Sequence, residues 1–178
     1  MSKTATLNSA APKASFWRRW RFHLSGLLLI LPIIYVPKYF DNLALSRGLM
    51  GLGQRPAGDV QVGPWKLQFA EWQIGAPKSD PAGMVKTFTM AQCAQCKDEI
   101  RAVYLRVGKP RSLRAAGSIF FGSPHRAFAT VPIPPRTAPD ADLWITAEGW
   151  DGSMHQAAWP IATASPATAE WLKKQGAN

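Results

Sequence analysis

The stretch LWITAEGWDGSMHQAAWPI, residues 143–161, decides the fold that the sequence predicts. Asp151 and Gly152 stand near its centre, and an Asp-Gly pair between two apolar runs is a strong signal for a two-residue hairpin turn. The runs on either side, ADLWITAEGW and MHQAAWPIA, are rich in the aromatic and β-branched residues that favour strands. We therefore expect a β-hairpin here.

Similar short apolar segments, separated by Gly and Pro, occupy the chain before this hairpin. The other candidate strands are GPWKLQFAEWQIG, VKTFTMAQC, IRAVYLRVG, GSIFFG and RAFATVPIP. In the first of them the apolar parity switches after Phe69 to Trp72 and Ile74, which indicates a β-bulge or a strand buried on both faces. About seven short strands with little helix predict a mainly β fold, either a small antiparallel β-sandwich or a partly open barrel.

The end of the chain predicts a short C-terminal helix. In SPATAEWLKKQ, Ser165 is a plausible N-cap, Pro166 suits the first helical position, and Lys173 and Lys174 fall in the last turn. Tryptophans are expected to supply much of the core of this small domain. They are Trp65, Trp72, Trp144, Trp150, Trp159 and Trp171.

The N-terminal segment predicts a membrane anchor. Five of the 21 Lys and Arg residues and none of the 11 Asp and Glu residues precede Phe22. The apolar segment FHLSGLLLILPIIYVPKYF follows, and as a helix it would be about 28 Å long, close to the ~30 Å hydrocarbon core of a bilayer. A cleaved signal peptide is the competing interpretation, but no small-x-small cleavage site follows Val36.

The positive-inside rule sets the expected orientation of this anchor. Residues 1–21 form a basic cytoplasmic tail, 22–40 the transmembrane helix, 41–59 a Gly-rich linker and 60–178 a periplasmic β domain. The predicted location is thus the bacterial inner membrane, with a single pass. A nucleic-acid partner is not expected, because the basic tail adjoins an apolar helix.

The stretch MAQCAQC contains both cysteines of the chain, Cys93 and Cys96. A c-type haem site is excluded because Lys97, not a histidine, follows the second cysteine, and a Cys₄ zinc site is excluded because no second pair exists. A thioredoxin-like redox pair would need a βαβ setting that the rest of the chain lacks.

Two interpretations of the cysteine pair remain open. In an oxidising periplasm, nearby cysteines form a disulfide, which here would pin a turn. The alternative is a copper or iron site, because thiolate, thioether and imidazole groups are ligands for such ions. The candidate donors are Cys93, Cys96, Met90, His125 and His155.

A window without acidic residues predicts a basic face. Between Ile100 and Pro139 there are seven Lys and Arg residues and no Asp or Glu. Such a face could attract an anionic ligand, lipid headgroups or an acidic partner. Its candidate residues are Arg101, Arg106, Lys109, Arg111, Arg114 and Arg126. No nucleophile elbow or paired-carboxylate motif stands out, so no catalytic residue is predicted.

The basic tail, the single anchor, MAQCAQC and LWITAEGWDGSMHQAAWPI together resemble one class of proteins. These are the small membrane-anchored accessory subunits of PepSY-type ferric-siderophore (ferric-pyoverdine) reductase systems. The resemblance implies a non-catalytic role in periplasmic iron release, with an integral-membrane reductase as the partner. Haem and electrons would belong to that reductase, this chain would need no cofactor of its own, and its basic face would attract the anionic ferric siderophore or dock the reductase.

A periplasmic copper or iron carrier, or an assembly factor, is the alternative function. It would use the Cys93 and Cys96 pair to hold the metal. Small periplasmic sandwiches of the oxidase-assembly type end in comparable Asp-Gly hairpins.

Overall fold

The computed structural model describes residues 16–47, 49, 51–112 and 115–176 of the 178-residue chain. The chain divides into two compact units, an N-terminal unit that ends at Asn42 and a second unit, Leu43–Asn178, that contains the β domain.

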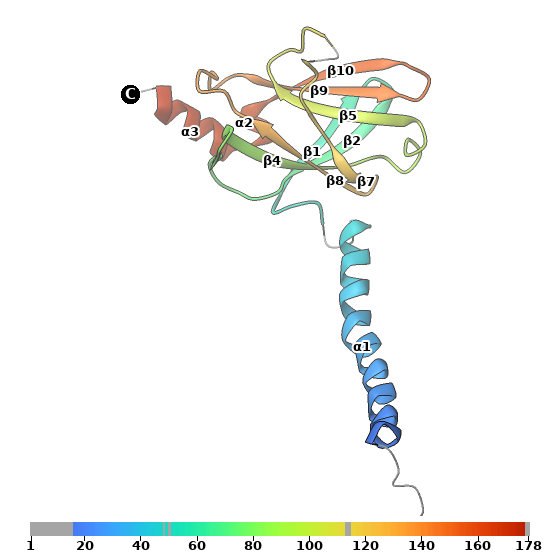
Figure 1. Cartoon of the computed structure of the whole chain (residues 1–178). Coiled ribbons are helices and arrows are strands. Elements are labelled where there is room, and N and C mark those ends of the chain that lie inside the picture. The colour runs from blue at the N-terminus through green and yellow to red at the C-terminus, as the bar shows by residue number, and fades with distance from the viewer. Residues whose placement is uncertain (1–15, 48, 50, 113–114, 177–178) are drawn as a thin grey trace, which may run out of the picture. The chain divides into compact units, whose positions relative to one another are not determined.

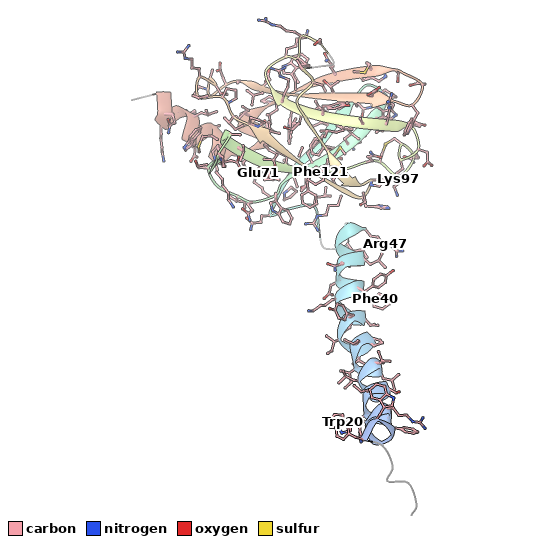
Figure 2. The ribbon with its side chains drawn as sticks, in the orientation of Figure 1. Trp20, Phe40, Arg47, Glu71, Lys97 and Phe121 are labelled. Carbon is pink, nitrogen blue, oxygen red and sulfur yellow. A yellow bond between two sulfur atoms is a disulfide. The ribbon has the colours of Figure 1, made fainter. Side chains whose placement is uncertain are left out.

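The N-terminal helix α1 spans Phe16–Ser46 (Figure 1). It is longer at both ends than the predicted 22–40, because neither flank carries a Gly or Pro stop signal. Within it, the 25 residues Trp20–Ala44 have the length and composition of a membrane-spanning helix, and none of that segment is buried in the fold. Its apolar side chains project freely, as Trp20 and Phe40 do in Figure 2.

The β domain consists of two antiparallel sheets in a sandwich-like arrangement (Figure 1). The larger sheet has the order β1 (Arg55–Val62), β2 (Trp65–Glu71), β4 (Gly83–Ala91), β8 (Arg126–Pro132), β7 (Phe121–Ser123), and β3 (Lys78–Asp80) also pairs with β4. The smaller sheet has the order β10 (Met154–Pro160), β9 (Asp142–Gly149), β5 (Ile100–Val107), β6 (Ser118–Ile119). Two short helices, α2 (Ile161–Ala164) and α3 (Pro166–Gly176), follow β10. The mainly β fold predicted from the sequence is confirmed.

The linker predicted for residues 41–59 is too long, because β1 begins at Arg55. Its sequence, RPAGDVQV, contains the Pro and Gly residues that suggest a linker. Pro56 is tolerated because β1 is the edge strand of its sheet. The register shifts between Pro56 and Gly58, and Gly58 has a φ of +98°, so the irregularity is a bulge that glycine accommodates. The bulge therefore lies opposite the parity switch of β2, whose residues Phe69–Glu71 are all buried.

The predicted hairpin is present as β9 and β10, but its connection is longer than two residues. Glu148 pairs with Met154, so residues 149–153 lie between the last paired positions. Asp151 Oδ1 accepts a hydrogen bond of 2.9 Å from the backbone N–H of Ser153, and Gly152 has a φ of +81°. Hydrogen bonds from the Ser153 side chain and backbone lower the pKa of Asp151.

Aromatic rings fill the centre of the sandwich. The ring centroid of Phe69 lies 5.0 Å from that of Trp159 and 5.8 Å from that of Phe120, and Phe88 lies 5.9 Å from Trp159. Phe120 sits where the chain passes from β6 in one sheet to β7 in the other, and its N–H donates to Val103 O at 2.8 Å. This passage ties the two sheets together.

A buried carboxylate, Glu71, joins the helical end of the domain to the larger sheet. Its Oε2 lies 2.5 Å from Arg55 Nε and its Oε1 lies 2.8 Å from Lys86 Nζ, and Ser165 Oγ donates to the same Oε1. Arg55 also donates to the carbonyl oxygens of Thr163 and Ala164, at the end of α2. We call Glu71, Arg55, Lys86 and Ser165 the Glu71 cluster.

The Glu71 cluster also begins α3. Ser165 Oγ accepts the N–H of Thr168 at 3.4 Å, which confirms the predicted N-cap. Lys86, only 5% exposed, donates to the carbonyl oxygens of Gln73 and Gly75 at 2.8 and 2.6 Å. Every charge of the cluster is therefore met by several hydrogen bonds, which is the condition for burying it.

Glu71→Gln is expected to destabilise the fold by about 3 kcal/mol, because the neutral amide leaves buried Lys86 without its counter-charge. Burial raises the pKa of Glu71, but hydrogen bonds from Arg55, Lys86 and Ser165 and the charge of Lys86 outweigh it, so the pKa lies below its ordinary 4.5. The carboxylate's contribution is therefore complete above about pH 4.5 and is lost as the pH falls through the lower folded pKa.

Urea unfolding of the full chain in mild detergent between pH 3 and 7, followed by tryptophan fluorescence, measures both effects. Glu170→Gln makes the same chemical change at an exposed position of α3 and is the control. Equal free energies of unfolding for the two variants would contradict this role of Glu71. So would a Glu71→Gln variant that loses as much stability at acid pH as the wild type.

Candidate functional site

The cysteine pair lies in the loop between β4 and β5 and forms a disulfide. Cys93 and Cys96 are bonded through sulfur, with Cα atoms 5.3 Å apart. Cys96 is 2% exposed, and its carbonyl oxygen accepts the N–H of Ile100 at 3.2 Å, where β5 begins. In the structure MAQCAQC is thus a turn closed by a disulfide, as in the first of the two interpretations. In this state neither sulfur is a thiolate, the form that binds metal or attacks a disulfide.

The other proposed metal donors have separate surroundings. Met90 is 1% exposed in the core, and His125 occupies the exposed turn between β7 and β8, where its Nε2 lies 3.4 Å from Lys97 Nζ. His155 packs edge-on against Trp65, with ring centroids 5.2 Å apart. Among the described residues, no group of three His, Cys, Asp or Glu side chains is placed to hold a metal ion.

His155 lines a cleft of about 340 Å³ that the sequence did not reveal. Trp65 Nε1 donates to Glu99 Oε2 at 2.7 Å in its wall, and Trp150 and Asp151 from the β9–β10 connection line it as well. The carboxylates of Glu99 and Asp151 already accept hydrogen bonds, from Trp65 Nε1 and from the backbone N–H of Ser153. These bonds stabilise this end of the sandwich.

The predicted basic face is divided between the two sheets. Arg101, Arg106 and Lys109 lie on or beside the outer face of the smaller sheet, and Arg111 is exposed in the loop that follows Lys109. Arg126, in contrast, belongs to β8 of the larger sheet. The sequence analysis grouped these residues because they share one window without acidic residues. Residues that are close in the chain can nevertheless belong to different sheets. Arg114 lies outside the described residues.

Tryptophan rings accompany the basic residues of the smaller sheet. Lys109 Nζ lies 5.0 Å from the ring centroid of Trp144, and the Arg101 guanidinium lies 5.7 Å from that of Trp150, within cation–π range. We call this surface the basic–aromatic face. Its members are Arg101, Arg106, Lys109, Arg111, Trp144 and Trp150.

The members of the basic–aromatic face differ in how far their charge is engaged. Arg101 pairs with Glu148 at 3.0 Å, and Arg106 donates to the carbonyl oxygens of Val107 and Ala115. Lys109 and Arg111 are exposed, and in the described part of the chain neither has an acidic residue within ion-pair distance. Lys109 and Arg111 therefore carry the positive charge that an anionic ligand or partner could meet.

Three of the six tryptophans that were expected to supply much of the core lie outside it. Trp65 and Trp159 are each 4% exposed, but Trp150 is 67% exposed. Trp144 lies between the buried residues Leu143 and Ile145 and so points to the outer face, and Trp72 lies on the outer side of the larger sheet. The alternation of Leu143, Trp144 and Ile145 was the available signal for Trp144.

The native chain is expected to have an intact mass lower by two hydrogens than the reduced chain, with no bound metal. The double variant Cys93→Ser/Cys96→Ser should lose about 2 kcal/mol of stability, because the bridge closes only a very short loop. Mass spectrometry with and without reductant, together with urea unfolding, measures these quantities. A native mass unchanged by reductant, or a metal ion lost only in the double variant, would contradict the structural role of the pair.

The comparison with known proteins identifies one family. Neither a curated protein nor a solved structure matches the chain. A family model described as "Uncharacterised conserved protein UCP029505" matches residues 16–162, from the first residue of α1 to a point just after β10. The match covers both the helix and the two sheets, well over half of the 178 residues. The chain therefore belongs to the uncharacterised conserved protein family UCP029505.

Proposed function

We propose that this chain is a membrane-anchored accessory subunit that acts by binding on the periplasmic side of the inner membrane. The observation that carries the proposal is the bare apolar helix: no part of Trp20–Ala44 is buried in the fold. A helix of this composition that is exposed on every side needs an apolar solvent, and a bilayer supplies one. The family match begins at Phe16 and includes this helix together with the domain.

The disulfide supports the proposed compartment. Disulfides persist in the periplasm and outside the cell and are rare in the cytosol. Cys93 and Cys96 are the only cysteines of the chain and are bonded to each other. The basic N-terminal tail supports the matching orientation, with the tail inside and the β domain across the membrane.

The basic–aromatic face supports a binding role for the domain. Exposed cations beside aromatic rings suit a ligand that is both anionic and partly apolar, and a ferric siderophore is of this kind. The same surface suits an acidic patch on a partner protein. In the proposed role, the partner is a PepSY-type membrane reductase that carries the haem and the electrons, and this chain supports its release of iron from the siderophore.

A reporter fused behind Asn178 is expected to be active only if it is a periplasmic reporter, because α1 places the two ends of the chain on opposite sides of the membrane. Alkaline phosphatase and green fluorescent protein fusions, expressed in parallel, measure the orientation. A fusion that lacks residues 16–46 is the matched control and should lose phosphatase activity. Bright green fluorescence from the full-length fusion would contradict the proposed topology and compartment.

The double charge reversal Lys109→Glu/Arg111→Glu is expected to weaken the chain's support of iron release. Both side chains are exposed, so their reversal changes surface charge and not the core. The measurement is the rate of iron release from ferric pyoverdine by a reconstituted PepSY-type reductase, with and without the full chain, at two ionic strengths. The wild-type effect should diminish at the higher salt because surface charges are screened.

Lys173→Glu/Lys174→Glu, on exposed positions of α3, is the matched control with the same change in net charge. Equal losses in the two double variants would show a general charge effect and contradict a role for this face. A rate that does not respond to the full chain at all would contradict the accessory function itself.

A further inference from the structure

The outer face of the larger sheet carries an aromatic and apolar surface. The Phe128 ring lies 5.2 Å from that of Trp72 and 6.4 Å from that of Phe121, between centroids. Phe121 is 65% exposed and Ile74 is 59% exposed (Figure 2 labels Phe121). We call this surface the tether face. Its members are Trp72, Ile74, Phe121, Arg126, Phe128 and Thr130.

The rings of Trp72, Phe121 and Phe128 share one side of the larger sheet, and Ile74 lines a cleft of about 230 Å³ together with Trp72 and Thr87. Thr130 is exposed, whereas its neighbours Ala129 and Val131 are fully buried. Thr130 Oγ1 lies 3.1 Å from Thr87 Oγ1 on the adjacent strand β4. The inward positions of β8 thus face the core, and the outward ones belong to the tether face.

The segment that follows α1 joins the domain at this face. The N–H of Gln54 donates to Trp72 O at 3.3 Å, and Gln54 Oε1 accepts the N–H of Ile74 at 2.9 Å. Gly51 and Gly53 line a cleft of about 270 Å³ together with Trp72 and Arg126. A Cβ on Gly53 would lie 2.2 Å from Glu71 O, so glycine is needed for this close passage.

The segment that connects the anchor to the domain is short. Eight residues separate Ser46, the last residue of α1, from Arg55, the first residue of β1. Fully extended, they reach at most about 28 Å. The first residue of β1 therefore lies within about 28 Å of the end of α1.

We propose that the tether face docks on the phospholipid surface of the membrane that holds α1. This inference rests on the proposed membrane anchoring. The residue types fit a bilayer interface, where aromatic rings lie at the level of the headgroups. The Arg126 guanidinium stacks on the rings, 4.8 Å from the centroid of Trp72 and 5.2 Å from that of Phe128. Because Arg126 is only 6% exposed, it supports the rings from behind, and the lipid contact falls to the aromatic and apolar side chains.

A lipid surface fits this patch better than a second copy of the chain. The short segment between α1 and β1 keeps the domain at a high local concentration of lipid. A small apolar patch is therefore enough for docking. A stable protein dimer would need a buried interface of roughly 1,000 Å² or more. Docking through the larger sheet would leave the basic–aromatic face, on the smaller sheet, free for a soluble or protein ligand.

The test uses the full chain in nanodiscs of phosphatidylcholine and phosphatidylglycerol, with an environment-sensitive fluorophore on one added cysteine. Thr130→Cys places the reporter on the tether face, and Ala158→Cys places it at an exposed position of the smaller sheet. Labelling without reductant preserves the Cys93–Cys96 bridge. A nitroxide on the lipid headgroup is expected to quench the reporter at position 130 and to leave the reporter at position 158 unquenched.

Adding Ile74→Asp and Phe121→Asp to the Thr130→Cys chain should abolish this quenching. Both replaced side chains are more than half exposed, so the core stays intact, and circular dichroism checks the fold. Equal quenching at positions 130 and 158, or none at 130 in a chain that is inserted, would overturn the inference. Shielding of position 130 that appears in detergent and grows with protein concentration would indicate a second copy and would also overturn it.

Carbonate extraction and vesicle flotation separate this inference from the proposed function. A chain that does not float with vesicles contradicts the anchor and with it the proposed function. A chain that floats but is not quenched at position 130 contradicts only the docking of the tether face.

Discussion

The buried charge of Glu71 is the constraint on which the rest of the domain depends. One carboxylate holds β1 through Arg55, β4 through Lys86 and the start of α3 through Ser165. Such a charge is tolerated only while all of its partners are in place, because an unpaired ion in a protein interior costs several kcal/mol. The first strand, the middle of the larger sheet and the C-terminal helices must therefore assemble together. The first strand is also where the segment from α1 enters the domain, so the same cluster fixes the point at which the domain is attached.

The two outer faces of the sandwich offer different chemistry. Lys109 and Trp144 form part of a positive surface on the smaller sheet, whereas Phe121 and Ile74 form an apolar surface on the larger one. Two sheets packed through their inner faces necessarily present their outer faces in opposite directions. A domain held close to a membrane can therefore meet the lipid with one sheet and a ligand or partner with the other. This division is consistent with the proposed accessory role, in which one surface is positioned for binding.

Much of the fold followed from local pattern. The β9–β10 hairpin, five other strand segments and the capped helix α3 were predictable, because turn residues, β-branched and aromatic content, and N-cap chemistry all act within a few residues. The strand β1 was not, since a proline and a bulge glycine are acceptable only on an edge, and edge position is a property of the assembled sheet. The site was less predictable still. Arg126 and Lys109 share a window of sequence, but Arg126 belongs to the larger sheet and Lys109 follows a strand of the smaller one. Glu71 showed no local sign that it would be buried.

The sequence alone determined the apolar N-terminal helix, the mainly β domain and the close spacing of two cysteines. These features depend on length, periodicity and interactions between residues that are close together in the chain. Tertiary structure alone decided that the cysteines are bonded, that Trp144 and Trp150 face outward, and that Glu71 binds residues up to 94 positions away. Such contacts form only when distant segments are brought together, and the free energy that selects among them comes from the packing and desolvation of the whole domain. This free energy depends on residues from the whole chain, so no short stretch of sequence predicts it.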